Sequence, residues 1–209
     1  TDLAVEIQEL HKVEEKDGFS EEEYSAKGIS VSRVKITGEQ AALKLSKPIG
    51  EYVTVDLGES FSDEETHQNA VEVTSSEISR LLYGEKKTEE TVPDVLVVGL
   101  GNRQMTSDAV GPVTVDRILV TRHIKNNMPQ LYEQLGLNPV SAMSPGVLGQ
   151  TGIEAFEMVK SVCDAVKPSA VIVIDALASR KMNRLCRTVQ ISNTGISPGS
   201  GVGNRRSEI

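Results

Sequence analysis

Two uninterrupted apolar runs constrain the fold of this chain more than any other feature. They read VLVVGL at 95–100 and AVIVI at 170–174. Neither run alternates with polar residues, which is typical of strands buried on both faces of a parallel sheet. Between them lie expected helices and one short expected strand: 108–122, 128–135, 140–143 (the strand) and 152–166. This alternation predicts an α/β domain over 94–209, with a mainly parallel sheet flanked by helices and a third candidate strand at 187–191.

The first 93 residues predict an N-terminal α+β region that packs on this domain. Alternating or β-branched apolar residues indicate two strands, at 29–36 and 52–55. Helix formers indicate two helices, at 39–47 and 62–83. Ser62 is the expected N-cap of the last helix, with Glu65 as its capping-box partner. The Glu-rich stretch 5–27 is expected to be weakly ordered, and 85–93 to be a linker.

Charge divides the chain at the same place. Residues 1–93 carry a net charge of −11 and residues 94–209 a net charge of +3, within a total of −8. An acidic chain without a basic stripe is a poor candidate for direct binding to nucleic acid. No stretch approaches the ~18 apolar residues of a membrane-spanning helix, and the first residues lack the pattern of a secretory signal. Two cysteines cannot form a disulfide framework, so we expect a cytoplasmic protein.

Two carboxylates occupy positions suited to catalysis. Asp108 lies a few residues beyond the first apolar strand, and Asp175 directly follows the second. The carboxyl ends of parallel strands meet at one edge of the sheet, where such sheets place their sites. One ionised carboxylate can take a proton from water while a protonated partner polarises the scissile carbonyl, as in acid-pair peptide hydrolysis. Each residue also has a structural explanation, Asp108 as a helix N-cap and Asp175 as an anchor of the following turn.

Other chemistries lack their motifs. The chain has no Walker-type phosphate loop, no GxSxG, no HExxH and no CxxC, and Gln104 stands where a dinucleotide-binding turn has its third glycine. We therefore expect no cofactor and no metal. Two glycine-rich loops, 144–152 and 197–206, can present backbone N–H groups to a peptide or an oxyanion. The substrate-binding candidates are Gly101, Asn102, Gly146, Gly149, Gly199 and Gly201.

Four long segments resemble the spore germination protease family. They are VVGLGNRQMTSDAVGPVTVDRILVTRHI (97–124), SPGVLGQTGIEAFE (144–157), VIVIDALASR (171–180) and NTGISPGSGVGNRR (193–206). TDLAVE at 1–6, VSRVKI at 31–36 and KPIGEYVTVD at 47–56 fit the same family. The resemblance implies an endopeptidase of Firmicutes that degrades small acid-soluble spore proteins in the spore core during germination.

The resemblance carries further expectations. It implies a fold similar to that of the hydrogenase maturation proteases, which is phosphorylase/hydrolase-like, and an aspartic-type dyad of Asp108 and Asp175. It implies a zymogen that assembles as a homotetramer, and a natural chain that starts earlier and continues past residue 209. The family's substrates are cut beside an acidic–apolar–Ala step. Because Asp2-Leu3-Ala4 has this pattern, the N-terminus is expected to resemble a substrate.

Two alternatives stay open. One is a nickel-dependent endopeptidase of the hydrogenase-maturation type, in which Asp108 contacts the metal. Those enzymes also use a later histidine, and no histidine follows His123 in this sequence. The other is a non-catalytic α/β module that binds a peptide or a nucleotide in the same crevice, although Gln104 disfavours the nucleotide.

Overall fold

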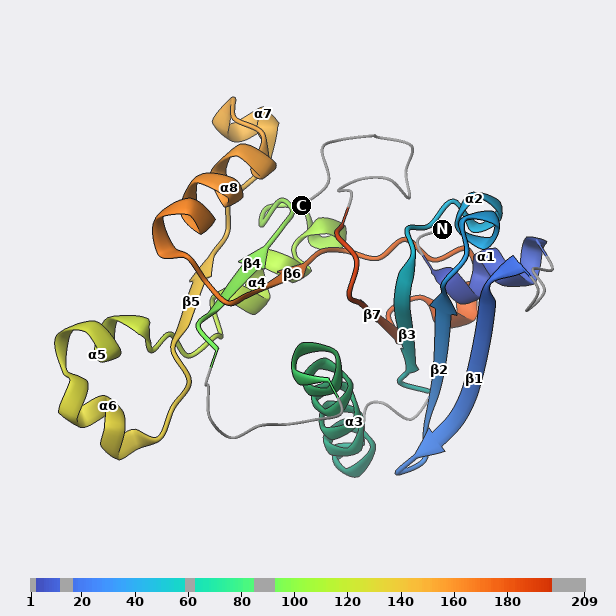
Figure 1. The fold of residues 1–209 in the computed structure, drawn as a ribbon, viewed down its shortest axis with the longest axis horizontal. Coiled ribbons are helices and arrows are strands. Elements are labelled where there is room, and N and C mark those ends of the chain that lie inside the picture. The colour runs from blue at the N-terminus through green and yellow to red at the C-terminus, as the bar shows by residue number, and fades with distance from the viewer. Residues whose placement is uncertain (1–2, 12–16, 59–62, 85–92, 197–209) are drawn as a thin grey trace. The chain divides into compact units, whose positions relative to one another are not determined.

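The computed structural model describes residues 3–11, 17–58, 63–84 and 93–196 (Figure 1). These residues divide into two compact units. The first, here called the antiparallel unit, comprises the described residues up to 84 together with 177–195. The second, here called the parallel unit, comprises 93–176 and the described residue Ile196.

A four-stranded antiparallel sheet forms the centre of the antiparallel unit. Its strands, in spatial order, are β1 (Phe19–Ala26), β2 (Ile29–Ile36), β3 (Gly50–Asp56) and β7 (Thr188–Ser192). Side chains alternate across the sheet, so Val31 and Val34 point to opposite faces. Val34 packs in a core with α1 (Ala4–His11) and α2 (Glu39–Leu45), whereas Val31 packs in a core with α3 (Glu64–Tyr83).

Two expectations for this unit were wrong. The stretch 5–27 was expected to be weakly ordered, but its described residues include most of α1 and all of β1, and Glu21–Glu23 lie in β1 paired with β2. The side chains of Glu21, Glu22 and Glu23 are exposed. Asp63 rather than Ser62 caps α3, because the Asp63 carboxylate accepts a hydrogen bond from Thr66 N–H. Ser62 lies outside the described residues. The expected linker at 85–93 also lies outside them, except for Pro93.

The strand expected at 187–191 exists but belongs elsewhere. It forms β7, which pairs antiparallel with β3 instead of joining the parallel sheet. The sequence placed residues 177–195 in the region 94–209, and the structure groups them with the antiparallel unit. Local apolar pattern predicts a strand, but the pairing partner is set by residues more than a hundred positions away.

A three-stranded parallel sheet confirms the expected α/β class in the parallel unit. Its strands lie in the order β5 (Val140–Met143), β4 (Val95–Gly99) and β6 (Ala170–Ile174). Its helices are α4 (Val110–Val115), α5 (Arg122–Asn127), α6 (Pro129–Leu135), α7 (Leu148–Thr151) and α8 (Ala155–Val166). β4 is buried throughout: Leu96 and Val98 pack with Val159 of α8, while Gly99 on the other face meets α4.

Two details of this unit differ from expectation. β6 is an edge strand of the described sheet, so Val171 is 40% exposed and the run at 170–174 is not buried on both faces. The helix expected over 108–122 is interrupted, with a 3-10 turn, η2 (Thr106–Asp108), before the short α4. α4 contains Gly111, Pro112 and three valines, which are weak helix formers. None of the described helices is long and apolar enough to cross a bilayer.

A buried carboxylate fastens α3 to the antiparallel sheet. Glu77 is 4% exposed and receives two hydrogen bonds from the Arg33 guanidinium, 2.7 Å to Oε1 and 3.2 Å to Oε2. Tyr24 Oη and Arg80 Nε donate to the same carboxylate at 2.7 and 3.0 Å. Burial alone raises the pKa of Glu77, but these hydrogen bonds outweigh it and hold the pKa below the ordinary 4.5. Burial and then the bond to Glu77 raise the pKa of Tyr24 to about 12.

We expect Glu77→Gln to destabilise the protein by about 3 kcal/mol, since it leaves two arginines facing a neutral amide in a buried site. Urea denaturation at neutral pH measures this. The matched control is Glu72→Gln on the same helix, which removes an exposed ion pair with Lys27 and is expected to leave the unfolding free energy nearly unchanged. Equal losses in the two variants would contradict the assignment of Glu77 as the buried anchor.

The lowered pKa of Glu77 also gives a pH dependence. A carboxylate with a depressed folded-state pKa stabilises fully above its unfolded pKa and loses that contribution as pH falls through the folded value. Wild-type stability should therefore fall as pH drops below about 4.5. Glu77→Gln should show a shallower fall over the same range; parallel curves for the two proteins would contradict this prediction.

Candidate functional site at the carboxyl edge of the parallel sheet

The carboxyl ends of the three parallel strands come together at one edge of their sheet. Leu100 N–H, just past β4, donates to the Ile174 carbonyl at the end of β6 (2.8 Å). Ser144, just past β5, donates its hydroxyl to the Gly99 carbonyl (3.0 Å). These two bonds join the segments that leave all three strands. The edge is therefore the place where side chains following β4, β5 and β6 can act on one ligand.

Asp108 folds back onto the turn that follows β4. It lies in η2, and its Oδ2 accepts a hydrogen bond from Asn102 N–H at 2.8 Å. The N-cap of α4 is Ala109, which makes no side-chain capping bond. The explanation of Asp108 as a helix N-cap is thus wrong, because its carboxylate is directed to the turn instead.

Gly101 permits this approach of Asp108 to the turn. Its φ is +111°, which favours glycine, and a methyl group placed on it would overlap the Asp108 carbonyl oxygen and lie 2.9 Å from Oδ1. Gly111 acts in the same way on α4, since a methyl group there would come within 2.6 Å of the Ile174 carbonyl oxygen. Both glycines let backbone segments meet at the edge without intervening side chains.

The loop 144–152 is bonded to the same turn. Its Gln150 side chain donates from Nε2 to Asn102 Oδ1 at 3.1 Å, and that oxygen also accepts from Gln104 N–H at 3.0 Å. Gly146 has φ +76°, a left-handed conformation in this loop, and Gly149 lies in α7 with open space around its Cα. The structure therefore brings Gly101, Asn102 and the 144–152 loop into one neighbourhood with Asp108.

Asp175 follows β6 at the same edge. Its Oδ1 accepts a hydrogen bond from Ala176 N–H at 2.9 Å, as expected for an anchor of the following turn. Asp175 adjoins Ile174, whose carbonyl is bonded to Leu100 N–H, and Leu100 adjoins Gly101. Short stretches of bonded backbone thus connect the two aspartates. Gly199 and Gly201 lie outside the described residues.

Sequence reasoning missed two residues of this edge, Ser144 and Gln150. Both stand in the quoted segment SPGVLGQTG, but nothing in that segment tells which polar residues turn towards the strand ends. Within the described part of the chain, no group of three His, Cys, Asp or Glu side chains is arranged to hold a metal ion. Cys163, on α8, is half-buried and packs against the core of the parallel unit.

Fold and site define an α/β protein with polar groups, two of them carboxylates, gathered at the carboxyl edge of a parallel sheet. The germination protease family profile matches residues 1–209, and the chain belongs to this family. It is similar to the germination protease of Caldanaerobacter subterraneus subsp. tengcongensis, at 49% identity over the whole chain and 63% of that protein. The chain is also 46% identical to the germination protease of Clostridium perfringens strain 13 and covers 64% of that protein. It is 43% identical to the germination protease of Bacillus pumilus and covers 58% of that protein; both comparisons span the whole chain. The chain thus spans a little under two thirds of the length of these relatives.

The packing of Asp108 on Gly101 gives a test of the edge. Gly101→Ala should lower the unfolding free energy by about 2 kcal/mol or more, since it adds both an overlap and an unfavourable φ. Gly136→Ala is the matched control: Gly136 also has positive φ (+57°) but open space around it, so about 1 kcal/mol is expected. Thermal denaturation followed by circular dichroism measures both, and equal losses would contradict the close contact at Gly101.

Proposed function

We propose that this protein is an endopeptidase that begins the degradation of small acid-soluble spore proteins during germination, with Asp108 and Asp175 as its catalytic pair. The observation that carries the proposal is the convergence of both aspartates on one sheet edge in a chain of the germination protease family. Gly101 and Gly111 lie where backbone segments meet beside the aspartates. Aspartates that were merely exposed on the surface would not require glycines at these points.

The proposed mechanism needs only the two carboxyl groups and a water. One carboxylate accepts a proton from the water as its oxygen attacks the peptide carbonyl, while the protonated partner donates its proton to the carbonyl oxygen. A proton then passes to the amide nitrogen as the C–N bond breaks, which yields one new carboxyl group and one new amine. This chemistry places the pair in the class of aspartic-type proteases and needs no cofactor.

The glycine-bearing loops are proposed to hold the substrate. Gly149 is exposed with open space beside it, so an extended peptide can approach its backbone closely, and Asn102 links the loop 144–152 to the turn that carries Asp108. Gly101 and Gly146 are half-buried in the same neighbourhood and are proposed to line the same substrate path. Gly199 and Gly201 are proposed for the same role on the basis of sequence alone. Backbone N–H groups in such loops can also receive the charge that develops on the carbonyl oxygen.

Further parts of the proposal rest on family membership. We infer that the substrate is a small acid-soluble spore protein, that the enzyme acts in the spore core, and that it assembles as a homotetramer from a zymogen. The parallel β5-β4-β6 sheet with helices on both faces of β4 is compatible with a fold like that of the hydrogenase maturation proteases. A metal-assisted mechanism of that type would make cleavage depend on added nickel.

The direct test uses the natural full-length protein and a purified small acid-soluble spore protein. Asp108→Asn and Asp175→Asn should each lower kcat by about a hundredfold or more while the circular dichroism spectrum stays unchanged. Asp164→Asn is the control, because Asp164 is an exposed aspartate whose described partner is Lys160 on the same helix. Full activity in both active-site variants, or activity only with added nickel, would overturn the proposed pair.

A further inference from the structure

Glu6 is a second buried carboxylate, and it lies far in sequence from the residues of the sheet edge. Glu6, on α1, has a side chain only 1% exposed, beside the fully buried Leu3 and Ala4. Burying a carboxylate without partners costs several kcal/mol, so its surroundings must supply hydrogen bonds. Its described partners come from one segment, residues 179–184, which is separated from it by more than 170 positions and lies in the same unit.

Residues 179–184 wrap around the Glu6 carboxylate. Arg180 N–H donates to Oε2 at 2.8 Å, and Lys181 N–H donates to Oε1 at 3.1 Å. The Ser179 hydroxyl also donates to Oε1 at 3.1 Å, and Arg184 Nη1 lies 3.5 Å from the same oxygen. Two successive backbone N–H groups aimed at one anion form a nest, a backbone shape that an anion stabilises.

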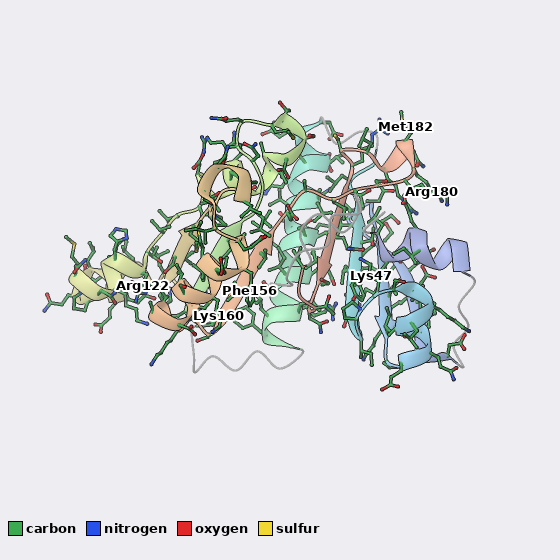
Figure 2. The ribbon with its side chains drawn as sticks, turned by 90° about the horizontal axis from the view of Figure 1, so that it is seen from above. Lys47, Arg122, Phe156, Lys160, Arg180 and Met182 are labelled. Atoms are coloured by element: carbon green, nitrogen blue, oxygen red, sulfur yellow. The ribbon has the colours of Figure 1, made fainter. Side chains whose placement is uncertain are left out.

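Most side chains of this segment are exposed, at 180–183, and Arg184 is half-buried beside Glu6. Arg180 and Met182, labelled in Figure 2, have exposed side chains, with Met182 85% exposed. The backbone amide of Arg180, by contrast, is turned to Glu6. Contacts with Glu6, from two backbone N–H groups and from the side chains of Ser179 and Arg184, therefore hold this segment in place.

The segment held by Glu6 begins four residues after Asp175. Only residues 176–178 lie between Asp175 and Ser179, and a fully extended chain spans at most about 3.6 Å per residue. The Ala176 N–H that bonds Asp175 Oδ1 belongs to this short connection. The direction in which the chain leaves β6 therefore affects both the hydrogen bond to Asp175 and the orientation of its carboxylate.

We propose that Glu6 is a positioning residue for the reaction: through Ser179, Arg180 and Lys181 it fixes the chain that leaves Asp175 and so orients the Asp175 carboxyl group. The inference rests on the proposed role of Asp175. Glu6 touches no reacting atom. It acts from α1, through hydrogen bonds to residues 179–181 within the antiparallel unit.

Glu6→Gln keeps the size of the side chain but replaces one acceptor oxygen by an NH₂ group that faces backbone N–H donors. We expect kcat to fall by roughly tenfold to a hundredfold, since small misplacements of catalytic groups have effects of this size. KM should change by less than about threefold, because substrate contacts remain. The amide resonance of Ala176 should shift in the NMR spectrum of the variant.

Glu77→Gln is the matched control, measured well below its melting temperature. Glu77 is also a buried carboxylate of the antiparallel unit, but its described partners are Tyr24, Arg33 and Arg80 rather than the segment after Asp175. Its kcat and its Ala176 resonance should match wild type. An equal loss of kcat in Glu77→Gln would reduce the Glu6 effect to general destabilisation and overturn the inference.

Two outcomes separate this inference from the proposed function. If Asp175→Asn is inactive but Glu6→Gln keeps wild-type kcat and an unshifted Ala176 resonance, the positioning role is wrong and the catalytic pair stands. If Asp175→Asn is fully active, the catalytic pair is wrong, and with it the role of Glu6 in the reaction. A shifted Ala176 resonance in Glu6→Gln would then still report the physical link between α1 and the chain after β6.

Discussion

The hydrogen bond from Leu100 N–H to the Ile174 carbonyl is the contact on which the candidate site depends. It continues the parallel pairing of β4 and β6 by one residue and holds the two strand exits together. Asp175 then follows directly on one exit, and the turn that carries Asp108 follows on the other. Glycines at 101 and 111 carry no side chain at this meeting point, so Asp108 and the neighbouring backbone segments can approach closely.

The physics of buried strands made the parallel sheet predictable. An uninterrupted apolar run such as 95–100 is stable only when both faces are covered, and β4 is covered by α4 and α8 as that rule requires. The same rule overstated the burial of β6, because an apolar run does not reveal whether its strand is central or lies at an edge. The location of Asp108 and Asp175 beyond the strand ends followed from strand direction alone.

Long-range pairing was not predictable from local pattern. β7 resembles any short apolar strand, yet it completes the antiparallel sheet beside β3, and this returns the chain after Asp175 to the first unit. The sequence did not predict the burial of Glu6. A glutamate in the first turn of a helix is ordinarily exposed to water and interacts favourably with the helix dipole. Its burial depends on the backbone amides of residues 180 and 181, which no sequence rule places beside it.

The central claim is that Asp108 and Asp175 act on one water as a single unit. Residues that act as a unit are strongly non-additive, so a double-mutant cycle on kcat/KM tests the claim most directly. Measured in the natural full-length protein on a purified small acid-soluble spore protein, the Asp108→Asn/Asp175→Asn double variant should be no slower than the slower single variant. Losses that multiply across the two sites, or single variants that keep wild-type kcat/KM, would contradict the account.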